Sequence, residues 1–236
     1  MFLRQTVNRI KRHSAKAVFA LLTLLTVPAA QANFQLETMT VILNADEDRK
    51  VFSVKNTSKE PILLSTKIQD IPGGDAIAKD IMISPPIIRI EPQGSQQINF
   101  ILKKGVSLPH EAMLKVSFQG VSSAKQNVTK MPIRQDVAML VVPKGLVESQ
   151  KPWENLKIEQ SGNQLTLTNS GKQVVRLSPN FVTLPDNQTR SIGQLYLRPG
   201  ESKAVNVEGP VKEIKLSPLS RYGFKSPTDV TMPVSK

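Results

Sequence analysis

The sequence contains no cysteine and only two histidines in 236 residues. Disulfides, thiol chemistry and cysteine-ligated metal sites are therefore excluded. His13 precedes the predicted folded part, and His110 lies in the loop sequence SLPHEAM, where a surface histidine is the ordinary interpretation. The sequence also has no nucleophile elbow and no phosphate-binding loop. It thus predicts no catalytic site, no metal site and no cofactor.

An apolar run long enough to span a bilayer is also missing, since AVFALLTLLTVPAA at 17–30 has about 14 residues. Five basic residues and no acidic residue precede this run, and it ends in the Ala-Gln-Ala pattern at 30–32 that signal peptidase accepts. We expect a secretory signal peptide at 1–32 and an exported protein that does not span the membrane. An uncleaved anchor is the alternative, which Pro28 and the shortness of the run disfavour.

Aromatic residues make up 5% of the chain, and no basic cluster is interleaved with them, which argues against nucleic acid as a partner. Removing residues 1–32 with their five basic side chains leaves 204 residues and lowers the net charge from +12 to +7. Without disulfides, a chain of this length must be held together by core burial, in one large domain or two modest ones.

Short strand-like runs separated by turns fill the rest of the sequence. Seven candidates have the spacing of an all-β sandwich and lie at 34–43, 50–56, 62–71, 81–92, 96–104, 112–121 and 136–143. Pro85-Pro86 inside one run predicts an edge strand or a strand that switches sheets. GLVESQKPWEN at 145–155 reads as a linker, and a second set of strands follows it. We therefore expect an N-terminal domain at 33–148 and a C-terminal domain at 149–236.

Basic side chains on these strands are the main chemical signal. Lys115 alternates with the apolar residues of MLKVSFQ, Arg89 lies in IIRIEP, and Lys144 ends LVVPK beside the linker. A lysine on a strand is usually a solvated residue of the outer face. The alternative is that some of these side chains line a groove between the two domains and bind an anion such as a chain-terminal carboxylate.

Several stretches in a fixed order resemble a known family. VFSVKNTSKEPILLSTKI, ISPPIIRIEPQGSQQINFIL, HEAMLKVSFQGV and AMLVVPKG resemble the N-terminal domain of periplasmic pilus (fimbrial) assembly chaperones of the chaperone–usher pathway. LTLTNSGKQVVRL and LYLRPGES are similar to segments of that family's second domain. Ala138 stands where many members carry a lysine five residues before a proline. The chain therefore resembles the non-classical (alternate or archaic) branch more closely.

The resemblance implies an all-β protein of two immunoglobulin-like β-sandwich domains in an L-shaped arrangement. Such a chaperone binds, folds and caps pilus subunits by lending its seventh strand to their incomplete fold, and delivers them to an outer-membrane usher. The expected donor side chains are Val128, Met131, Ile133, Val137 and Met139, and we expect Ile133 and Val137 to be solvent-exposed before a subunit arrives. For the subunit's terminal carboxylate, Lys115 is the first candidate and Lys144 the second, with Arg134 and Arg89 more distant.

Two other classes of protein are alternatives to the chaperone. A pilus subunit, an adhesin or another exported immunoglobulin-like binding module is the first, but a subunit would usually have one domain and an N-terminal donor extension. A secreted hydrolase is the second, and the lack of a nucleophile–base pair disfavours it.

Overall fold

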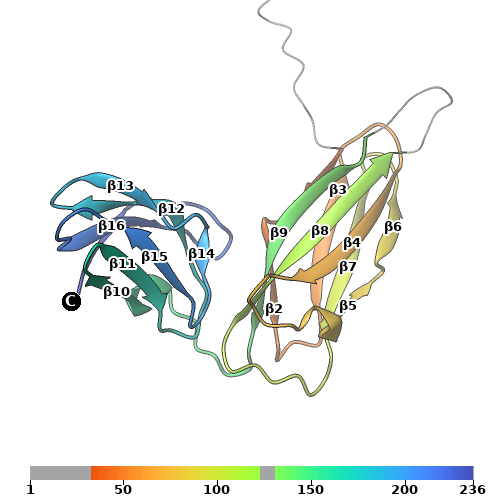
Figure 1. Cartoon of the computed structure of the whole chain (residues 1–236). Helices are drawn as coiled ribbons and strands as arrows, with labels where there is room; N and C mark the ends of the chain where they lie inside the picture. The colour runs from red at the N-terminus through yellow and green to blue at the C-terminus, as the bar shows by residue number, and fades with distance from the viewer. Residues whose placement is uncertain (1–32, 123–130, 236) are drawn as a thin grey trace, which may run out of the picture. The chain divides into compact units, whose positions relative to one another are not determined.

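The computed structural model describes residues 33–122 and 131–235, and strands dominate this part of the chain (Figure 1). Residues Asn33–Lys236 form one compact unit. The helical segments among the described residues are short 3-10 turns, η1 (Ala78–Asp80) and η2 (Pro152–Asn155). The expected signal peptide and Val128 lie outside the described residues.

The first nine strands form two sheets, which we call the N-terminal sandwich. One sheet has the order β1 (Phe34–Leu36), β3 (Lys50–Asn56), β7 (Ser95–Leu102) and β5 (Ile81–Ser84). The other has the order β2 (Thr40–Asn44), β9 (Ile133–Val142), β8 (Ala112–Ser122), β4 (Ile62–Asp70) and β6 (Ile87–Ile90).

The remaining strands form the C-terminal sandwich. Its smaller sheet has the order β10 (Leu156–Ser161), β11 (Gln164–Asn169) and β15 (Ser202–Asn206). Its larger sheet has the order β13 (Gln188–Ser191), β12 (Val175–Leu184), β16 (Glu213–Pro218) and β17 (Val230–Pro233), and β14 (Tyr196–Leu197) pairs with β12. No described strand pairs across the two sandwiches. The expected all-β fold of two sandwiches is confirmed, whereas the domain limits at 148 and 149 stay a prediction.

Alternating apolar side chains build a separate core in each sandwich. In β3, Phe52 and Val54 are buried while Lys55 is exposed, as the period of two predicts. In β8, Leu114 and Phe118 are buried on the inner face. A third, smaller cluster of Met113, Leu140 and Val174 joins the two sandwiches.

Two predicted strands are each divided between sheets. The run at 34–43 is not one strand, because β1 pairs with β3 while β2 pairs in parallel with β9 in the other sheet. The run at 81–92 divides at Pro85-Pro86 into β5 and β6, which are edge strands of different sheets. Proline has no N–H to continue a ladder. The prediction of an edge or a sheet switch at these prolines is therefore confirmed.

A buried asparagine ends one strand in each sandwich. The Asn56 side-chain amide donates to the carbonyl oxygens of Glu60, Ile90 and Glu91, at 2.8, 3.0 and 3.1 Å. The Asn169 amide donates to the carbonyl oxygens of Gln173 and Leu197, at 2.8 and 2.9 Å. Each asparagine thus links backbone carbonyl groups of separate segments around the end of its strand.

Candidate functional site

The N-terminal part of β9 has a free edge. β9 pairs with β8 from Ile133 to Val141, but β2 pairs with it only from Ala138 to Val142 (Figure 1). Among the described residues, Ile133–Val137 therefore has a paired strand on one side only. The Gln135 side-chain amide donates to the carbonyl oxygen of Phe34, on β1 of the other sheet, at 3.0 Å. An unpaired strand edge can accept a further strand.

The side chains of β9 divide into two groups along its length. Val137 and Met139 are 5% and 0% exposed and belong to the core of the N-terminal sandwich. The expectation that Val137 is solvent-exposed is therefore wrong, and the burial of Met139 likewise speaks against its expected role as a donor side chain. β2 closes the sheet beside Met139 and contributes buried Val41 and Leu43 to the same core. The inward-facing positions of this half of β9 are consequently filled by the protein's own fold.

Farther toward the start of β9, the apolar side chains are more accessible. Ile133 is half-buried against the same core, and Met131, just before the strand, is 83% exposed. Of the five expected donor side chains, Met131 and Ile133 thus lie beside the free edge. Arg134, the next residue of β9, is exposed and donates from Nε to Asp136 at 2.7 Å and from Nη2 to Ser117 at 2.8 Å.

The opposite face of this sheet carries a row of residues from three neighbouring strands. Lys115 on β8 is paired with Ala138 on β9, and Ala138 is paired with Thr40 on β2. Since paired residues share a face, Lys115 and Thr40 flank the small Ala138. One step along the strands, Met113 and Leu140 contact Val174 of the C-terminal sandwich. The row therefore lies at the junction of the two sandwiches.

A cleft of ≈ 700 Å³ opens beside this row. Lys115, Asp136 and Ala138 line it from the N-terminal sandwich. Arg176 lines it from the C-terminal sandwich, together with an apolar and aromatic rim of Leu195, Tyr196, Tyr222 and Phe224. The cleft thus combines two cations with apolar surface, which suits a ligand with an anionic group on an apolar residue.

The Lys115 side chain is 42% exposed, and its ammonium nitrogen lies 3.9 Å from Asp136. Partial burial alone would raise the pKa of Asp136, but the hydrogen bond from Arg134 and the charges of Arg134 and Lys115 lower it. Because Arg134 already holds Asp136 at 2.7 Å, Lys115 makes the looser contact. Lys115 can therefore turn to another anion at little cost.

A buried carboxylate ties the two sandwiches together next to the cleft. Glu111 is 1% exposed, accepts a hydrogen bond from the Val174 backbone N–H at 2.8 Å and forms an ion pair with Arg221. Arg221 also pairs with Glu148. Burial raises the pKa of Glu111, outweighing the lowering by Arg221 and by the Val174 N–H, and the charge of Glu148 raises it further.

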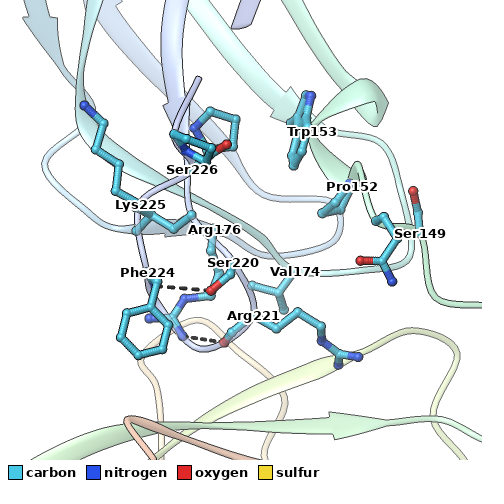
Figure 2. A pocket seen from close by; sticks show the side chains of 14 residues that line it. Ser149, Pro152, Trp153, Val174, Arg176, Ser220, Arg221, Phe224, Lys225 and Ser226 are labelled. Carbon is cyan, nitrogen blue, oxygen red and sulfur yellow. Dashed lines mark hydrogen bonds between the residues drawn. The ribbon is translucent and has the colours of Figure 1, made fainter. Parts of the chain in front are cut away.

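Arg221 also lines a second hollow of ≈ 310 Å³ in the C-terminal sandwich, shown in Figure 2. Arg176 lies beside it and donates from Nη1 to the Arg221 carbonyl oxygen at 2.9 Å, one of the dashed lines in the figure. The loop at 220–226 thus presents its backbone to Arg176 and the Arg221 side chain to Glu111. Figure 2 shows Phe224 on the same loop.

The structure separates the expected carboxylate-binding residues. Lys115 lines the cleft, whereas exposed Lys144 follows β9 and is not among the lining residues. Arg134 is bound to Asp136 and does not line the cleft, and Arg89 pairs with Glu91 at 2.7 Å on β6 and the turn after it. Lys115 is therefore the expected residue that the cleft supports best.

The sequence reasoning missed Arg176, Glu111 and Arg221. Arg176 follows two buried valines in QVVRL, so its outward position on a strand had the same signal as that of Lys115. Glu111 in PHEAM and Arg221 in LSRYG have no pattern that distinguishes them from surface loop residues. Their pairing across 110 residues arises only in the folded chain.

Comparison with known proteins identifies the family. Residues 33–147 match the family described as pili and flagellar-assembly chaperone, PapD N-terminal domain. The uncharacterized fimbrial chaperone YhcA of Escherichia coli (strain K12) is 31% identical over 200 residues, which cover 83% of this chain and 88% of YhcA. The chain belongs to the fimbrial assembly chaperones. Members of this family are not enzymes, and the expectation of a non-enzymatic chaperone is confirmed.

Solved chaperone structures share the fold. The CupB2 chaperone of Pseudomonas aeruginosa has a TM-score of 0.69 at 16% identity and covers 85% of this chain and 100% of that one. A structure of the Salmonella enterica SafA pilin in complex with the SafB chaperone gives a TM-score of 0.70 at 19% identity, covering 87% and 98%. The fimbrial chaperone described here thus has the two immunoglobulin-like sandwiches that its sequence predicts. None of the helices among residues 33–122 and 131–235 has the length and apolarity of a membrane span.

Proposed function

We propose that this fimbrial chaperone binds pilus subunits in the periplasm by adding the edge of β9 to their incomplete fold, and passes them to an outer-membrane usher. The observation that carries the proposal is the free edge at Ile133–Val137, which β2 leaves uncovered. A solved relative, SafB, is in complex with the SafA pilin. The same kind of partner accounts for an open edge that would otherwise promote aggregation.

The side chains beside this edge supply the apolar part of the contact. Met131 is almost fully exposed, and Ile133 is half-buried. Inserting an exposed side chain of this size into a partner's groove stabilises a complex by about 1.5–3 kcal/mol. We therefore assign the donor role to Met131 and Ile133, with Val128 as an expected third donor.

Lys115 serves in the same proposal as an anchor for the subunit's terminal carboxylate. It pairs with Ala138, the position at which many family members carry a lysine, so its ammonium group can replace that lysine from the neighbouring strand. Its contact with Asp136 at 3.9 Å is long enough to be exchanged for a new anion. A charge-assisted bond in a partly dry cleft contributes about 1.5–3 kcal/mol.

Subunit capture in the periplasm tests this function. The tagged chaperone is expressed with a pilus subunit from the same cell, and the amount of subunit recovered with it is measured. Met131→Asp and Lys115→Met are each expected to reduce recovery severely while leaving the chaperone folded. Lys67→Met is the matched control, because Lys67 is an exposed lysine on β4 of the same sheet that does not line the cleft.

Two outcomes would contradict the proposal. Full recovery with Met131→Asp would show that the edge of β9 is not where the subunit binds. Equal losses with Lys115→Met and Lys67→Met would show that a general loss of charge, and not an anchor in the cleft, weakens capture.

A further inference from the structure

Arg176 is a half-buried arginine at the start of β12 that lines the cleft. Its Nη1 donates to the Thr40 hydroxyl at 2.7 Å. The same nitrogen donates to the Arg221 carbonyl oxygen at 2.9 Å, the bond drawn in Figure 2. Both acceptors are uncharged. The bond to Thr40 holds the guanidinium beside the row formed by Thr40, Ala138 and Lys115, and the bond to Arg221 fixes it to the loop at 220–226.

Among the described residues, no carboxylate pairs with Arg176. Its Nε is buried without a hydrogen-bond partner, and none of the hydrogen bonds described for these residues uses Nη2. Burial lowers the pKa of Arg176, and no opposite charge offsets this effect. A buried cation is costly unless it is paired, so an arginine kept in this state points to an anion that arrives from outside.

The acidic side chains near Arg176 already have other partners. Asp136 accepts from Arg134, and Asp70 accepts from the backbone N–H groups of Ile77 and Ala78 at 3.0 and 2.8 Å. Glu111 is bound to Arg221. The cleft thus has no spare internal anion for Arg176 within the described chain.

The surroundings of Arg176 also leave room at its free nitrogen. Gly223 has a φ of +86°, and a Cβ added there would lie 3.2 Å from Nη2. A glycine at this point therefore keeps the space beside Nη2 open and supplies a backbone conformation that other residues rarely adopt. Tyr222 and Phe224 on either side of it provide apolar surface, being 43% and 68% exposed.

We propose that Arg176 of the C-terminal sandwich is a carboxylate-binding residue of the cleft, which together with Lys115 holds the terminal carboxylate of a chain ending in an apolar residue. The inference deepens the proposed function and rests on it for the identity of the bound chain. It assigns half of the anchor to the C-terminal sandwich, so that a captured chain end contacts both sandwiches at once. The planar guanidinium group of arginine can bind both oxygens of a carboxylate at once, which the ammonium group of lysine does less well.

The free chaperone allows a direct test with a small probe. N-acetylphenylalanine carries the carboxylate and an apolar side chain, and N-acetylphenylalanine amide is the same molecule without the charge. Titration of each into isotopically labelled chaperone is followed by NMR through the Arg176 Nε–Hε resonance and the Gly223 and Ala138 amide resonances. We expect the acid to shift all three saturably and the amide to bind about ten- to hundredfold more weakly, the ratio given by a charge-assisted bond.

Variants separate Arg176 from its neighbours. Arg176→Met should remove most of the preference for acid over amide, and Arg176→Lys should retain part of it. Arg190→Met is the matched control, because Arg190 is a half-buried arginine of the same sheet, also with an unpaired Nε, that does not line the cleft. The wild-type shift of Arg176 requires no variant, so a variant that fails to fold leaves the test intact.

The proposal is overturned if acid and amide bind wild-type chaperone equally, if neither shifts the Arg176 resonance, or if Arg176→Met binds the acid as the wild type does. Subunit capture by the same variants is measured in parallel. A wild-type chaperone that binds the acid but captures no subunit would refute the proposed function while leaving the carboxylate site of Arg176 in place.

Discussion

Replacing Glu111 with alanine should be among the most destabilising single changes at the junction of the two sandwiches. The substitution removes the acceptor of the buried Val174 N–H and leaves Arg221, whose side chain is 20% exposed, with Glu148 alone. Breaking a buried ion pair by removing one partner costs about 3–5 kcal/mol. Because Arg221 remains paired with Glu148 and partly exposed to solvent, we expect a cost at the lower end of that range.

Urea unfolding followed by Trp153 fluorescence measures this loss, since the single tryptophan lines the same hollow as Arg221. Glu111→Gln keeps an acceptor for Val174 and should cost less than Glu111→Ala. The control is Glu154→Ala, whose ion pair with Lys151 is 64% exposed on both sides and contributes at most about 0.5 kcal/mol.

A loss of less than about 1 kcal/mol in the free energy of unfolding on Glu111→Ala would contradict this role of Glu111, because an exposed ion pair contributes as much. A second check comes from removing both charges. Glu111→Gln combined with Arg221→Met should be less destabilising than the sum of the two single changes. Each single change leaves the charge of the other residue without this partner, whereas the double variant removes both charges.

Three further predictions concern β9, a strand end and acid stability. Met139→Ala should lower the free energy of unfolding by about 2–5 kcal/mol, since Met139 is a core residue, whereas Met131→Ala should change it by less than about 0.5 kcal/mol; equal effects in urea unfolding would contradict this assignment. Asn56→Ala should cost about 1–3 kcal/mol because the carbonyl oxygens of Glu60, Ile90 and Glu91 each lose the hydrogen bond from its amide, and an unchanged melting temperature would speak against that role. Burial would raise the pKa of Glu201, but hydrogen bonds from Arg198 and Gln194 lower it to about 2. The pKa of Glu201 in the folded protein is below the unfolded value of 4.5, so its stabilisation is present above pH 4.5 and is lost as the pH falls toward about 2. Glu201→Gln should therefore make the free energy of unfolding less dependent on pH between these values. An unchanged pH dependence would exclude the effect.

The fold was predictable where side chains alternate strictly. β3 matches the predicted run at 50–56, and the paired prolines at 85 and 86 correctly marked a change of sheet. The break between β1 and β2 was not predictable, because FQLETMTVIL continues without proline or glycine and only its pairing with β3 and then β9 divides it. β13 was not predicted from the sequence either, because QTRS is a polar edge strand that contains no apolar residue.

The site was predictable only in part, because apolar strand-formers alone do not show which fold they fill. Met131, Ile133, Val137 and Met139 lie at even spacing in the sequence, yet Val137 and Met139 fill the protein's own core and Met131 does not. The deciding factor is where β2 begins to pair with β9, which is a property of tertiary pairing. Likewise, Arg176 meets Thr40 across 136 residues, a contact that no local pattern encodes.

Hydrogen–deuterium exchange of β9 shows whether a pilus subunit pairs with its free edge. Exchange is measured for the free chaperone and for the chaperone bound to a pilus subunit from the same cell. If β9 lends its edge, backbone amides in Ile133–Val137 should exchange more slowly in the complex, while those of the polar edge strand β13 in the C-terminal sandwich stay unchanged. A complex in which Ile133–Val137 exchanges as fast as in the free chaperone would contradict strand addition at this edge.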